Sequence, residues 1–109
     1  MVDIATFSSF DIRVGRIMSV EEHPTARKPM YKLTLDFGAE IGIRTIVAGI
    51  KSDYAAGELL NKKIVAIVNL DPKMIAGIES QGMILAAGEI GSVAIIVPDK
   101  DIEEGAKIH

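Results

Sequence analysis

The chain has 109 residues, a net charge of −3 and no cysteine. This length suffices for one domain, residues 1–109, and is too short for two. The lack of cysteine excludes disulfides, thiolate metal sites and thiol nucleophiles, and it is typical of the reducing cytoplasm, where we expect the protein to work.

Alternating apolar and polar residues predict five main strands and one short helix. In chain order, we expect the strands over residues 11–20, 31–37, 41–50, 62–70 and 82–88. A helical turn is expected at 53–61, between the third and fourth strands. Residues 3–10 form a short start or cap, 92–97 form a further strand-like piece, and an acidic, turn-rich and solvated tail begins at residue 98.

This order of elements predicts an all-β protein. Five strands, with a short helix between strands 3 and 4 and strand-like extensions at both termini, match an OB-fold, a small Greek-key barrel. Another small β-barrel is the alternative. In the third strand we expect Arg44 to point outward.

The connection at 69–83 is the most informative segment of the chain. Ordinary hairpins use two to five linking residues, and a loop this long is usually disordered or functional. Met74, Ile75 and Ile78 make it too apolar for disorder. We therefore expect an ordered surface that presents polar groups to a partner.

The sequence offers no arrangement that indicates catalysis. It contains no nucleophile–base pairing, no phosphate-cradling loop and no paired carboxylates in an apolar setting. His23, before a proline in a loop, is read as a hydrogen-bonded structural residue, and His109 is the last residue. We expect no enzyme, no cofactor and no metal site. No segment reaches the ~18 consecutive apolar residues of a membrane span, so we expect no membrane insertion.

Seven short motifs in one order carry a family resemblance. They are Asp-Ile-Arg-Val-Gly at 11–15, His-Pro-Thr-Ala at 23–26, Asp-Phe-Gly at 36–38, Ile-Val-Ala-Gly-Ile at 46–50, Asn-Leu-Asp-Pro-Lys at 69–73, Gly-Ile-Glu-Ser at 77–80 and Gly-Met-Ile-Leu-Ala-Ala at 82–87. The chain resembles the tRNA-binding domain family, which occurs at the C-terminus of many methionyl-tRNA synthetases and as free-standing homodimers. Residues 26–29 and 36–43 resemble its CsaA-like branch, described as secretion-related chaperones, whereas residues 82–87 are closer to the synthetase form.

The resemblance places RNA contacts on one barrel face and its loops. It implicates Arg13, Lys28, Lys32, Arg44, Asn69, Lys73, Ser80 and Met83. Plainer alternatives are Arg13 as a solvated surface charge, Asn69 as a partner for the loop backbone, Ser80 as a turn or strand-entry hydroxyl and Met83 as a core residue. Aromatic side chains are scarce, which favours recognition of a folded RNA's shape over stacking on single strands.

Apolarity and the resemblance together predict a homodimer. Hydrophobic residues make up 49% of the chain and mean hydropathy is +0.30, more than a small monomer readily buries. In the family the chain ends build the subunit interface. This implicates Phe7, Phe10, Ile96, Val97, Pro98, Ile102 and Ile108.

Three functions are compatible with these observations. The first is a non-catalytic, homodimeric tRNA-binding protein with little sequence dependence. The second is a CsaA-like chaperone that binds unfolded or export-bound polypeptide. The third is a detached subunit of methionyl-tRNA synthetase that delivers tRNA to a catalytic partner. The sequence leaves all three open.

Overall fold

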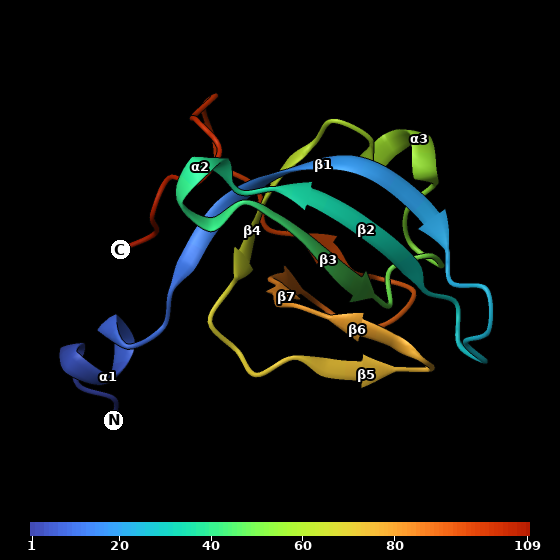
Figure 1. Cartoon of the computed structure of the whole chain (residues 1–109), viewed down its shortest axis with the longest axis horizontal. Helices are drawn as coiled ribbons and strands as arrows, with labels where there is room; N and C mark the ends of the chain where they lie inside the picture. Colours follow the sequence, from blue (N-terminus) through green and yellow to red (C-terminus); the bar gives the residue numbers. More distant parts are fainter.

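The computed structural model describes all of residues 1–109, and a five-stranded antiparallel sheet forms its centre (Figure 1). The strand order is β3-β2-β1-β4-β7. The bounds are Ile12–Glu22 for β1, Tyr31–Asp36 for β2, Ile43–Ala48 for β3, Lys63–Ile67 for β4 and Met83–Ile84 for β7. The five strands expected from the sequence are confirmed, although their ends differ by several residues.

The two edges of the sheet meet and nearly close it into an OB-type barrel. Close to the end strand β7, Gln81 N donates to Thr45 O on β3 at 2.8 Å. The Gln81 side chain returns the contact, since its Oε1 accepts from Thr45 N at 2.9 Å. Closure removes most of the unpaired strand edge that would otherwise invite aggregation.

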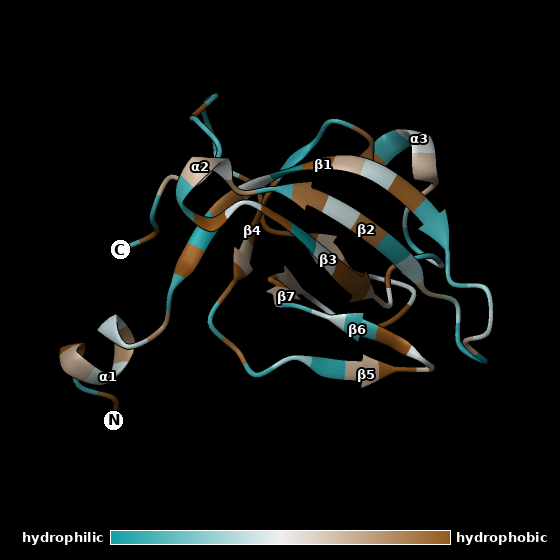
Figure 2. Ribbon diagram, viewed as in Figure 1, coloured by the Kyte–Doolittle hydropathy of each residue, from teal (hydrophilic) through white to brown (hydrophobic).

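Strict alternation along β2 builds the barrel interior. Its apolar residues are buried and its polar residues lie on the other side, a pattern visible as alternating colours along β1 and β2 in Figure 2. The core is completed by Phe37, Ile46 and Ile64, none of which is exposed. Gly15 is required where β1 passes over Phe37, because a Cβ at this position would lie 2.5 Å from the ring.

The chain also has three short helices: α1 (Ile4–Ser8), α2 (Gly38–Ile41) and α3 (Ala56–Leu59). The expected helical turn is confirmed as α3, which buries Leu59. Residues 3–10 contain α1, which is capped by the Asp3 side chain accepting from Thr6 N and has no buried residue. It stands away from the barrel at the left of Figure 1.

The acidic side chains of the C-terminal tail are largely solvated, as expected: Asp99, Asp101 and Glu103 are exposed. The sequence did not indicate that the backbone of the tail pairs with the barrel. Gly105 N donates to Val14 O, and Val14 N donates to Ala106 O, at 2.8 and 2.9 Å. The tail therefore extends the sheet along β1, next to the part of β1 that β2 does not reach. Upstream, the tail carboxylate of Asp101 lies 2.9 Å from Lys63 Nζ. This contact lowers the pKa of Asp101 and raises that of Lys63.

The segment expected as one strand at 82–88 is divided. Its first part is β7, and its second part forms β8 (Ala86–Ala87), which pairs with β9 (Ala94–Ile95). Leu85 stands between them, donating to Val65 O and accepting from Ile96 N. The chain thus leaves its pairing with β4 and continues in a separate two-stranded sheet.

Candidate nucleic-acid interface

The long connection at 69–83 folds into a hairpin beside β3. Its strands are β5 (Lys73–Ile75) and β6 (Ile78–Ser80). The two turn residues, Ala76 and Gly77, both have positive φ, 47° and 90°, as a type I′ turn requires. The expectation of an ordered segment is therefore confirmed. Figure 1 shows the hairpin along one side of the barrel, below β3.

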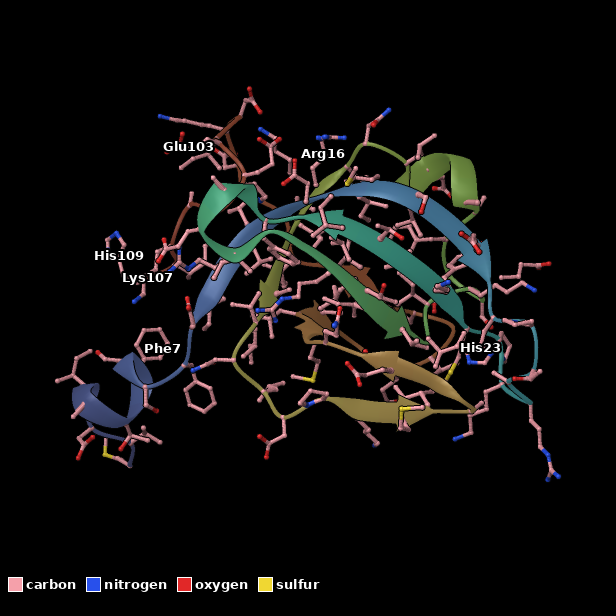
Figure 3. The ribbon with its side chains drawn as sticks, viewed as in Figure 1. Phe7, Arg16, His23, Glu103, Lys107 and His109 are labelled. Carbon is pink, nitrogen blue, oxygen red and sulfur yellow. The ribbon has the colours of Figure 1, made fainter.

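His23 holds the tip of this hairpin. Its Nδ1 accepts from Thr25 N at 3.1 Å and from Ala26 N at 3.0 Å. Because Nδ1 is an acceptor, Nε2 carries the proton and donates to Ile75 O at 2.8 Å. Thr25 Oγ1 adds a second bond, to Ala76 O at 3.0 Å. The structural reading of His23 is thus confirmed, and Figure 3 shows it beside the turn of the hairpin.

Two further side chains hold the base of the hairpin. Ser80 is 4% exposed, and its Oγ accepts from Val47 N at 3.0 Å and donates to Gly82 O at 3.3 Å. Arg44 Nη1 donates to Val68 O at 2.9 Å and to Gln81 O at 3.3 Å. The hairpin is therefore fastened along its length to the barrel.

The expected outward direction of Arg44 is wrong. Arg44 lies opposite Leu35, a fully buried core residue, in the β2–β3 register. Directly opposed residues point to the same side of a sheet, so Arg44 lies on the core side, at an end of the barrel. Its guanidinium completes the barrel closure by satisfying backbone carbonyls.

A cavity of about 240 Å³ lies between the hairpin and β3. It brings together three of the residues named from the sequence: Lys73, Ser80 and Met83. Met83 is 49% exposed, so it is not a core residue. The other lining residues were not singled out from the sequence as site residues: Val47, Leu70, Asp71, Ile75 and Gly82.

Lys32 and Lys28 extend this region. Lys32 lies opposite Val47 in the β2–β3 register, so its side chain leaves the sheet beside the cavity wall. Lys28 belongs to the loop that carries His23 and lines a second cavity, of about 370 Å³. Neither of these lysines, nor Lys73, takes part in a salt bridge, in contrast to Lys63 with Asp101.

Arg13 and Asn69 lie elsewhere and have partners within the chain. Arg13 is 8% exposed; its Nε donates to Asp11 at 2.6 Å and its Nη1 to Glu40 at 3.0 Å. Both bonds raise the pKa of Arg13 further above its usual value. Asn69 Oδ1 accepts from Asp11 N at 2.7 Å, and its Nδ2 donates to Ser9 O at 2.8 Å, so it ties the segment after α1 to the barrel.

The predicted dimer residues lie at the surface near the chain ends. Phe7, Phe10, Ile96, Val97 and Ile102 are 38–48% exposed, and Pro98 and Ile108 are partly buried. Figure 3 shows Phe7 on α1, away from the barrel. None of the helices is both long and apolar enough to span a membrane.

Comparison with known proteins identifies the family. The sequence model of the family described as "Putative tRNA binding domain" matches residues 12–107. The chain belongs to this family. It is 47% identical over 108 residues to a methionine–tRNA ligase of Pyrococcus furiosus, an alignment that covers 99% of this chain and 14% of the ligase. The chain thus spans about one seventh of the length of that relative.

Two solved structures resemble the whole fold. The CsaA chaperone protein from Picrophilus torridus superposes with a TM-score of 0.93 at 42% identity, covering 100% of both chains. A structure described as a MetRS related protein from Pyrococcus horikoshii gives a TM-score of 0.89 at 37% identity, covering 100% of this chain and 98% of the other. The chain is therefore similar both to a protein described as a chaperone and to one described as MetRS related.

Proposed function

We propose that the protein is a homodimer that binds tRNA without catalysing a reaction. The RNA lies on the outer side of β2 and β3 and on the β5–β6 hairpin, with Lys28, Lys32 and Lys73 around it; we refer to this surface as the hairpin face. The observation that carries the proposal is the conjunction of the family match with three lysines that have no ion-pair partner in the chain.

The chemistry of the hairpin face suits backbone recognition. A lysine that reaches a phosphate releases a condensed counterion, which gives affinity with little dependence on sequence and a steep dependence on salt. The hairpin face has no aromatic row on which several bases could stack, and stacking is the usual grip of OB-folds on single strands. Recognition then depends on the shape and phosphates of a folded RNA.

A second copy of the chain would cover the apolar residues at the chain ends. Phe7 and Phe10 are 38% and 41% exposed, and α1 buries nothing within its own chain. Two copies also join two hairpin faces, so the second set of contacts benefits from a high effective concentration. Sedimentation equilibrium tests this: the wild type should be a dimer, and Phe7→Glu with Phe10→Glu should be a monomer with weaker tRNA binding.

Filter binding of bulk tRNA tests the RNA contacts. Affinity should fall steeply between about 50 and 200 mM salt. Replacing Lys28, Lys32 and Lys73 by alanine should weaken binding. It should also make the slope of log affinity against log salt concentration (the salt slope) shallower by about 2 to 3, near one unit per lost phosphate contact. The matched control is Lys100→Ala in the tail, which should bind like the wild type. No retention of tRNA even at low salt would refute the proposal.

A second candidate is a chaperone, favoured by the likeness to a CsaA chaperone protein over the full chain. Its binding surface would be apolar, and Met74 at 61% and Met83 at 49% exposure lie on or next to the hairpin. In this case the protein should delay aggregation of an unfolding client, with weak salt dependence and no effect of the lysine changes. An unchanged rate of client aggregation would remove this candidate.

A third candidate follows from the identity to methionine–tRNA ligases, of which this chain matches a small part. As a separate subunit it would deliver tRNA to a catalytic partner that lacks such a domain. A pull-down with the tagged protein should then retain a methionyl-tRNA synthetase, and tRNA binding should raise the aminoacylation rate of that enzyme. An enzyme whose rate the protein leaves unchanged would count against this role.

A further inference from the structure

The cavity under the hairpin is not explained by phosphate contacts. Its walls are apolar, formed by Val47, Leu70, Ile75 and Met83. Its volume of about 240 Å³ lies below the roughly 300–1,000 Å³ of pockets that enclose drug-sized molecules. A cavity of this size has room for one flat heterocycle or one side chain, and not for a helix or a folded element.

Two charged groups stand at this apolar cavity. Asp71 and Lys73 both line it, and they are separated by a single proline in the chain. Asp71 takes part in no salt bridge and no side-chain hydrogen bond of the structure, so all of its acceptor positions are available. The cavity therefore offers a carboxylate acceptor and an ammonium donor, which form no ion pair with each other, next to apolar walls.

This combination suits a nucleobase better than a peptide side chain. An aliphatic side chain would use the walls and leave both charges unpartnered, and a cationic side chain would meet Asp71 but be repelled by Lys73. A base has apolar faces for the walls and an edge that both donates and accepts hydrogen bonds. The phosphates on either side of this nucleotide would lie near Lys73 and Lys32.

We propose that the cavity binds one unstacked base of the bound RNA, and that it prefers guanine. Guanine offers two adjacent donors on its Watson–Crick edge, N1–H and N2–H, which one carboxylate can accept together; Asp71 fills this role. Next to these donors is the O6 acceptor, to which the Lys73 ammonium donates. The proposal rests on the proposed function, because it places the base on the hairpin face.

The cavity is held in shape before any ligand arrives. His23 Nε2 donates to Ile75 O at 2.8 Å, and Ser80 Oγ accepts from Val47 N at 3.0 Å, so two of the wall residues are fixed by bonds through their backbones. A preformed pocket avoids the ordering cost that a flexible one would incur on binding. One base pocket is also compatible with general tRNA binding, since folded tRNA presents unpaired bases at its loops and end.

The test compares short oligonucleotides with matched backbones. Fluorescence anisotropy is measured with labelled hexauridylate, with the same chain carrying one guanosine, and with one inosine, which lacks the N2 amino group. We expect the guanosine chain to bind about tenfold more tightly than hexauridylate, within the range of one bidentate contact, and the inosine chain to fall between them. Asp71→Ala should bring the ratio to about one.

The ratio isolates the base contact, since removal of an acidic group alters the affinity of all oligonucleotides alike. Asp99→Ala, a change of the same charge in the exposed tail, should leave the ratio as in the wild type. A wild-type ratio of one, or an unchanged ratio in Asp71→Ala, would overturn the proposal. So would an apolar peptide that displaces the guanosine chain and binds Asp71→Ala as well as it binds the wild type.

Bulk tRNA measured in parallel separates the two levels of inference. Retention of tRNA without guanine preference would overturn the base pocket and leave tRNA binding in place. Failure to bind either tRNA or oligonucleotide would refute the proposed function, and the base pocket with it.

Discussion

The imidazole of His23 fastens the tip of the hairpin. Its ring has two separable functions: Nδ1 accepts from Thr25 N and Ala26 N and shapes the loop, whereas Nε2 donates to Ile75 O and holds the hairpin. His23→Asn retains an acceptor near the Nδ1 position and loses the bond to the hairpin. His23→Gln retains a donor near the Nε2 position and loses the two loop bonds.

The magnitudes follow from the number of bonds that each variant loses. One hydrogen bond contributes about 0.5–1.5 kcal/mol net, so His23→Asn should shift the hairpin equilibrium toward release about 2- to 13-fold. His23→Ala loses three bonds at an 8% exposed site and should cost about 1.5–4.5 kcal/mol. If the hairpin face binds tRNA as we propose, the apparent affinity should fall in proportion to the population of the fastened hairpin, and the salt slope should stay unchanged because the lysines remain.

Hydrogen exchange of the amides at 73–80 measures hairpin release, and filter binding measures its effect on tRNA. In His23→Asn we expect faster exchange that is confined to the hairpin, together with weaker binding. In His23→Gln exchange should accelerate chiefly at Thr25 and Ala26, whose amides lose their acceptor. Thr25→Val, which removes the lesser bond to Ala76 O, is a matched control with a smaller effect. Wild-type exchange at 73–80 in both His23→Asn and His23→Ala would refute the reasoning.

Two further predictions concern the barrel and the tail. Gly15→Ala should destabilise the protein by about 1–3 kcal/mol in urea denaturation, because the added Cβ would lie 2.5 Å from the Phe37 ring. Gly57→Ala is the control, since a Cβ at this position meets nothing within 4 Å. Equal stabilities of the two variants would contradict the packing argument. The pKa of Asp101 is held below its usual 3.8 by Lys63, so the contact stabilises the docked tail above about pH 4 and is lost as pH falls through the lowered value. Proteolysis of the tail by an acid protease should increase over this range, and at pH 7 a neutral protease should cleave the tail of Asp101→Asn faster than that of the wild type.

Much of the fold could be predicted because β-structure follows a period of two. Strand β2 alternates without interruption, so its bounds are almost those expected. Arg44 was misplaced because β3 carries apolar residues on both faces, such as Ile43 and Ile46, and gives no clear inside and outside. The sequence predicts an ordered surface at 69–83 but not the hairpin itself, since its three-residue strands are too short for any periodicity to show.

The sequence predicts only part of the candidate site. Lys73, Ser80 and Met83 do meet at one cavity, but nothing in a linear sequence shows that Asp71 and Leu70 turn into the same space. The docking of the tail on β1 was missed because its backbone bonds to Val14 carry no signature in side-chain composition. The pattern of charged residues indicates which side chains are exposed to water, but it does not indicate the strand with which a segment pairs.

Four polar residues bind the backbone of their own chain: His23, Asn69 and Ser80 of the motifs, and Arg44 of β3. A polar residue that satisfies a loop backbone is replaced only at the cost of that loop's conformation, whatever the ligand. Loss of RNA binding on mutating any of them therefore does not identify an RNA contact. The lysines without partners can be changed without altering the fold. A change in the salt dependence of RNA binding when one of them is replaced therefore reports directly on a contact. This separates the residues that build the hairpin face from those that we propose touch the RNA.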